Sequence, residues 1–185
     1  MAPAAGCGPP TLFLMSSLPF SQLAGHTIVS WVGTEMALSE GLQGEGPIVW
    51  AHPSVQYLQL ISIDMMLSDG EVYRVLSQSD DGSGYYGLYL ERLVAMEAPS
   101  CPESGSIYRT RMLNELPIGA VTIVVRESDG PSAVLRIEAI VDGSKVTLLS
   151  GEVYERDEGN FFVAERDESI LVQVDGVRPT SNLWG

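Results

Sequence analysis

Basic residues are scarce in this chain. Its 185 residues include ten Lys and Arg against 24 Asp and Glu, a formal net charge of −14. No Lys or Arg precedes Arg74, and Lys145 is the only lysine. Because so negative a protein repels the phosphate backbone and an anionic lipid surface, we expect neither nucleic-acid binding nor membrane association. Solubility, a cation or a basic protein partner remain as physical reasons for the charge.

Cysteine is almost absent as well. Cys7 and Cys101 lie in no CxxC or Cys/His cluster, which excludes a disulfide framework and a zinc site of the usual spacing. The apolar stretch near the N-terminus follows no positive charge and is too short for a signal peptide or a membrane span. We therefore expect a cytoplasmic protein. The preference for Arg over Lys, with abundant Gly, Ala and Val, indicates a bacterial source.

Motifs for catalysis or cofactor binding are missing. A Ser–His–Asp site would need His26 or His52 as its base, and no GxSxG surrounds any serine. There is no GxGxxG or P-loop. The loop at 77–84 has adjacent Asp80 and Asp81, whereas an EF-hand alternates its acids. We expect no catalytic residue, no cofactor and no metal site.

What the chain does contain is alternation of apolar and polar residues, broken by turn residues. It is 45% hydrophobic, with 19 Gly and 11 Pro. Period-two alternation is typical of half-buried strands, and Asp-Gly pairs such as Asp69-Gly70 and Asp142-Gly143 favour hairpin turns. The predicted fold is mainly β, with antiparallel meanders that form a small barrel or sandwich and one or two short helices.

The predicted organisation is an irregular N-terminal segment, residues 1–24, followed by one β-rich domain, residues 25–185. We expect a strand over 26–33 and then a short helix, with Thr34 as its N-cap. Residues 57–93 predict a three-stranded meander. Residues 94–118 fit either a short helix or an edge strand.

Residues 119–175 predict a five-stranded meander. Val121, Ile123 and Val125 are expected to share an inward face, and RDES (166–169) to form the turn before the last strand. The tetrapeptide GEVY occurs at 70–73 and 151–154. We expect the first glycine in a turn and the second at a bulge inside a strand, so the repeat indicates local strand chemistry and not a ligand motif.

Two surfaces are candidates for binding a partner. Tyr85 and Tyr89 share one face of a predicted strand, and exposed tyrosine is favoured in recognition; cross-strand packing is the simpler role. The second surface is a C-terminal acidic run that could attract a basic protein or simply protect a sheet edge from aggregation. Its acidic members are Glu152, Glu155, Asp157, Glu158, Glu165, Asp167 and Glu168.

A cavity inside the barrel is the competing kind of site. Trp50, Asp64 and Tyr73 are its candidate lining residues, with Asp64 as the polar group. The alternation of the strand around Asp64 equally predicts an outward-facing carboxylate.

These observations favour a non-enzymatic, acidic protein-binding module. A bacterial immunity protein or antitoxin that neutralises a basic partner protein is one such class. A small-molecule-binding barrel, possibly an enzyme, and a structural or assembly subunit are the alternatives. The residues alone do not identify the partner, a ligand or the oligomeric state.

Overall fold

The computed structural model describes residues 19–40, 46–79, 85–100, 105–128, 134–157 and 159–180. Within these ranges nine strands form one antiparallel sheet. Their bounds are β1 (Thr27–Met36), β2 (Leu58–Leu67), β3 (Val72–Ser79), β4 (Tyr86–Leu93), β5 (Tyr108–Met112), β6 (Gly119–Ser128), β7 (Val134–Val141), β8 (Ser144–Asp157) and β9 (Asn160–Val174).

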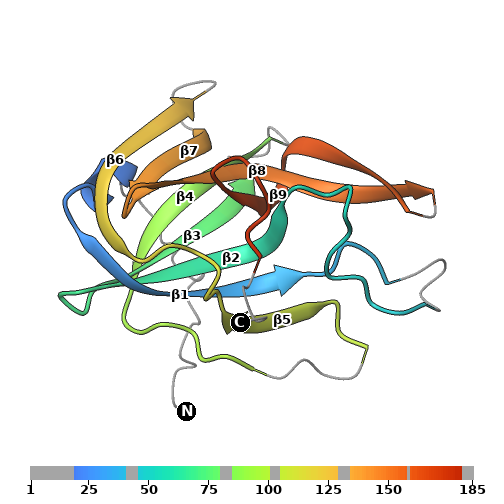
Figure 1. The fold of residues 1–185 in the computed structure, drawn as a ribbon, viewed down its shortest axis with the longest axis horizontal. Helices are drawn as coiled ribbons and strands as arrows, with labels where there is room; N and C mark the ends of the chain where they lie inside the picture. Colours follow the sequence, from blue (N-terminus) through green and yellow to red (C-terminus); the bar gives the residue numbers. More distant parts are fainter. Residues whose placement is uncertain are drawn as a thin grey trace, which may run out of the picture.

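The sheet closes into a barrel because β1 has two sets of partners (Figure 1). It pairs with β2 on one edge, and on the other edge with β6 at its start and β5 at its end. The closed ring of six strands runs β1-β2-β9-β8-β7-β6. The β3–β4 hairpin extends from β2, and β4 meets β7 at the pair Leu88–Val134. The predicted β-rich fold is thus confirmed, as a barrel.

The core fills the barrel with aliphatic side chains from almost every strand. The core side chains that are fully inaccessible to solvent include Leu60, Ile63, Val75, Leu90, Val141 and Ile170. The indole Nε1 of Trp31 donates to the carbonyl oxygen of Pro117 at 2.8 Å, which attaches the chain after β5 to the core. Burial of each such side chain contributes about 1.5–3 kcal/mol.

The predicted helix after residue 33 is wrong. Thr34 and Glu35 continue β1, because they pair with β2 on one side and with Thr110 and Arg109 of β5 on the other. The helix-forming residues were overridden by this two-sided pairing. Among the described residues the helical element is a single 3-10 turn, Phe20–Leu23, which buries Phe20 and Leu23. None of the described helical segments has the length and apolar content needed to cross a membrane.

Residues 94–118, for which the sequence allows either a short helix or an edge strand, contain the edge strand β5. Residues 101–104, with Cys101, lie outside the described residues, as do residues 1–18 with Cys7. The hairpin prediction at Asp142-Gly143 is confirmed. Both residues have positive φ, 48° and 85°, as a two-residue turn with right-handed twist requires.

The expected inward face of β6 holds only at its start. Val121 is 1% exposed, but the register against β7 shifts between Val121 and Ile123. This bulge reverses the alternation, so that Val124 packs on the core while Ile123 and Val125 are each 53% exposed. The predicted shared inward face is therefore wrong beyond Val121.

Residues 166–169 do not form a turn between two strands. The predicted fourth and fifth strands are one strand, β9, and the described part of residues 119–175 forms four strands. The register against β8 jumps from Ser150–Ile170 to Gly151–Glu165, so residues 166–169 bulge out of the pairing. Arg166 in this bulge has φ 62°. A bulge of this kind bends the strand that carries it.

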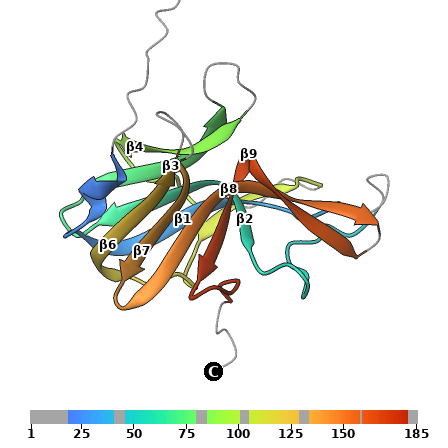
Figure 2. The same cartoon turned by 90° about the horizontal axis from the view of Figure 1, so that it is seen from above.

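The distal part of this hairpin, residues 151–157 and 160–165, projects from the barrel and is called the arm below (Figure 1). The view from above shows the same projection (Figure 2). A second, smaller apolar cluster fixes the base of the arm. Val153 and Leu171 pack there with Leu38 and Val55 of the loops between β1 and β2.

Candidate functional site

Where the arm leaves the barrel, the bulge of β9 brings tyrosines and carboxylates together. The ring of Tyr85, immediately before β4, lies 5.2 Å from the guanidinium carbon of Arg166. The hydroxyl of Tyr154 donates to Asp167 at 3.0 Å. We call this surface the bulge patch and define it as Tyr85, Tyr154, Arg166, Asp167 and Glu168. Glu165 flanks the bulge but pairs with Gly151, which places it on the opposite face of the hairpin from Tyr154.

Hydrogen bonds from two serine side chains hold the backbone of the bulge patch in place. The hydroxyls of Ser77 (β3) and Ser150 (β8) donate to the main-chain carbonyl oxygen of Asp167 at 2.7 and 3.1 Å. The side chains around it are open to solvent: Tyr85 is 58% and Tyr154 38% exposed, and Glu168 is exposed. The protein therefore presents aromatic rings and negative charge on a backbone fixed by three strands.

Glu152 is separated from this surface by burial. Its side chain is 5% exposed and accepts a hydrogen bond from the Ser169 hydroxyl at 3.4 Å. Burial, and then the charges of Asp167 and Glu168, raise the pKa of Glu152 to about 7. Glu152 is thus a buried carboxyl that titrates near neutral pH.

The other predicted acidic residues of the arm divide between different environments. Glu155 accepts a hydrogen bond at its Oε1 from the backbone N–H of Gly159, at 2.9 Å. This bond, and a side-chain hydrogen bond with Ser39, lower the pKa of Glu155. Asp157 is exposed near the tip, and Glu158 lies outside the described residues. The acidic run is therefore not one continuous surface.

The two candidate tyrosines also differ. Tyr89 is half-buried and pairs with Leu76 across β3 and β4. Tyr85 lies in the bulge patch, beside Arg166. Sequence alternation gives both tyrosines the same face but does not show how far each lies from the end of the hairpin.

The structure does not bring Trp50, Asp64 and Tyr73 into one cavity. Tyr73 is in the barrel core, and its hydroxyl donates to Glu71 at 2.8 Å. Asp64 points to the opposite face of the sheet, since Tyr73 pairs with its neighbour Met65. Trp50 lies in the loop before β2, beside the arginines of β5.

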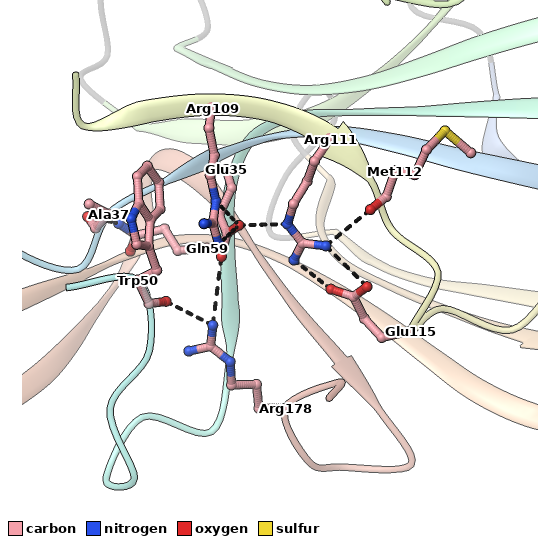
Figure 3. Close-up of polar contacts among 9 residues, drawn as sticks. All are labelled: Glu35, Ala37, Trp50, Gln59, Arg109, Arg111, Met112, Glu115 and Arg178. Carbon is pink, nitrogen blue, oxygen red and sulfur yellow. Dashed lines mark hydrogen bonds and ion pairs between the residues drawn. The ribbon is translucent and has the colours of Figure 1, made fainter. Parts of the chain in front are cut away.

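Those arginines surround a carboxylate that is almost fully buried (Figure 3). Glu35 is 1% exposed, and its Oε2 accepts from Nε of Arg109 at 2.8 Å and from Nε of Arg111 at 2.7 Å. Arg178, which follows β9, approaches Oε1 at 3.7 Å. Arg111 also binds Glu115, and Arg178 donates to the carbonyl oxygen of Trp50 at 2.8 Å. We call this group, with Trp50, the arginine pocket.

The sequence alone does not predict the arginine pocket. One signal was available: Arg109 and Arg111 alternate in YRTRM, which places both on one face if the segment is a strand. That face has meaning only with Glu35, which lay in the wrongly predicted helix, and with Arg178 near the other end of the chain.

No group of three or more His, Cys, Asp or Glu side chains within the described ranges is arranged to hold a metal ion. Comparison of the chain with protein-family models, curated proteins and solved structures gives no match. Function must therefore be argued from the geometry of this chain.

Proposed function

We propose that this protein is a non-enzymatic, acidic protein-binding module that captures a basic partner protein through the bulge patch. An immunity protein or antitoxin of the bacterial cytoplasm is the class of protein that this proposal fits. The observation that supports the proposal is that the bulge of β9 places Tyr85 beside Arg166 and Tyr154 beside Asp167, with the exposed Glu168 in the same bulge.

Each kind of side chain in the bulge patch has a different role in such binding. The carboxylates attract a positive partner from a distance, and the net charge of −14 adds to that attraction. Tyrosine supplies apolar contact area with a polar tip and loses little conformational freedom on binding. Charge gives fast association, and the aromatic rings give the complex its lifetime.

The rigid base of the bulge patch supports the same proposal. Since Ser77 and Ser150 both bind the carbonyl oxygen of Asp167, the bulge is fixed before a partner arrives. A surface that is already ordered loses less entropy on binding. The exposed carboxylates keep this surface soluble while it is free.

The test is co-purification of the tagged protein from its source cells, followed by reconstitution with the purified partner. The proposal expects a basic partner, a 1:1 or other fixed stoichiometry, and an affinity that falls steeply as salt rises from about 50 to about 300 mM. For an immunity protein or antitoxin, co-expression also relieves the toxicity of that partner. A captured protein that is acidic, or binding indifferent to salt, contradicts the proposal.

A further inference from the structure

The arginine pocket lies outside the bulge patch and has an unusual charge balance. Three of the ten basic residues in the chain, Arg109, Arg111 and Arg178, meet there around two carboxylates, Glu35 and Glu115. In a protein with a net charge of −14, this is a local excess of one positive charge. The side chains line a pocket of about 400 Å³, within the size range of small-ligand sites.

The positive charges are not equally satisfied. Arg111 is fully engaged: burial opposes its charge, but hydrogen bonds to Glu115 and Glu35 outweigh this and raise its pKa. Arg178 is different. Its Nη2 approaches Glu35 only at 3.7 Å, beyond hydrogen-bond range, and its buried Nη1 has no hydrogen-bond partner among the described residues. Burial, opposed by Glu35 and reinforced by Arg111, lowers the pKa of Arg178.

Arg109 is the guanidinium best placed to meet a ligand. Its Nε and Nη2 are both directed at one oxygen of Glu35, at 2.8 and 2.7 Å, and its side chain is still 32% exposed. The Trp50 ring lies 4.1 Å from its guanidinium carbon (Figure 3), which holds the plane of the group. A guanidinium fixed in this way can bind an oxyanion with a defined geometry.

A purely structural cluster would be expected to balance its charges, because an uncompensated buried charge is costly. An anion in the pocket would supply the missing negative charge. We propose that the arginine pocket is a binding site for a small carboxylate or phosphate ligand, with Arg109 as the direct contact and Arg178 as the charge that attracts it. Glu35 is then a positioning residue that holds the three arginines together.

The probes are sodium phosphate and sodium acetate, each added at constant ionic strength with sodium chloride as the reference. The readout is NMR of the Trp50 indole N–H and the arginine Nε–H signals. We expect saturable shifts of the Trp50 and Arg109 signals, with a dissociation constant of about 1 mM or tighter for at least one probe. Tighter phosphate binding indicates a phosphorylated ligand, and tighter acetate binding indicates a carboxylic acid.

Two variants test the assignment. Arg178→Met keeps much of the side-chain length and removes the charge, and we expect it to weaken binding about tenfold or more. Arg126→Met, at an exposed arginine of β6, is the matched control and should change binding less than about twofold. If Arg178→Met does not fold, Arg178→Lys keeps the charge and should bind at least half as tightly as the wild type. Absence of a saturable shift in the wild type, or equal binding by Arg178→Met and the wild type, overturns the proposal.

Discussion

Asp64 of β2 and Arg74 of β3 are direct cross-strand partners joined by two hydrogen bonds, Nε–Oδ1 at 2.6 Å and Nη2–Oδ2 at 2.9 Å. Asp64 is 1% exposed and also accepts from the backbone N–H of Glu97 at 3.0 Å. Asp64 is thus held by partners from two separate segments of the chain. Its role is to join the β2–β3 hairpin to the chain that follows β4.

Asp64→Asn should therefore destabilise the fold by about 3 kcal/mol, because it leaves Arg74 partly buried without its main counter-charge. The measurement is the free energy of unfolding in urea. Arg92→Gln is the control on the neighbouring β3–β4 pair, since Arg92 is 60% exposed where it pairs with Glu71, and this change leaves the hydrogen bond from Tyr73 to Glu71 in place. That exposed pair should contribute less than about 1 kcal/mol. Equal effects of the two variants would contradict the structural role of Asp64.

Glu152 predicts a dependence of stability on pH. Its pKa is about 7 in the folded protein, against an ordinary value of 4.5. Between these two values the folded state holds the proton more firmly than the unfolded state, so stability falls as pH rises through this window. The loss is about 3 kcal/mol and is complete just above pH 7.

Glu152→Gln removes this titration and isolates its effect. The free energy of unfolding of the variant, minus that of the wild type, should increase by about 3 kcal/mol from about pH 4 to about pH 8. Urea titrations of both proteins at several pH values measure the difference. A difference that does not change with pH would mean that Glu152 titrates like an exposed carboxylate.

Gly151 is required by the close approach of the two strands of the arm. A Cβ at this position would lie 2.6 Å from the backbone carbonyl oxygen of Ala164. Gly151→Ala should cost about 1–3 kcal/mol and shift the NMR signals of the Ser77 and Asp167 amides, because the bulge must move. Gly143→Ala is the control: its φ is 85° but no atom lies within 4 Å of the added Cβ. This control should lose stability without moving those two amides.

The sequence predicts an antiparallel β fold, a barrel or a sandwich, because local alternation and turn chemistry agree over most of the chain. It fails where pairing between distant strands decides the outcome. Thr34 and Glu35 have helix-compatible neighbours, but β2 and β5 hold them in a strand. The bulges after Val121 and Glu165 shift the register by contacts that no single-strand pattern contains.

The candidate sites show the same limit. The sequence predicts Tyr85 and the acidic run as two separate surfaces, and the bulge is what places Tyr85 beside Arg166 and Tyr154 beside Asp167. In the sequence Glu152 looks like the other acids of the C-terminal run, yet its side chain is buried. The arginine pocket joins side chains from positions 35, 109 and 178, and no spacing along the chain indicates that proximity.

The central claim, capture of a basic partner through the bulge patch, is tested most directly by association rates with the reconstituted partner. The double variant Glu165→Gln/Glu168→Gln removes two exposed charges at the bulge, and Glu40→Gln/Glu127→Gln removes two exposed charges elsewhere. At low salt we expect the first to slow association about fivefold and the second less than about twofold. Equal slowing by both variants, or no slowing by either, would contradict the account.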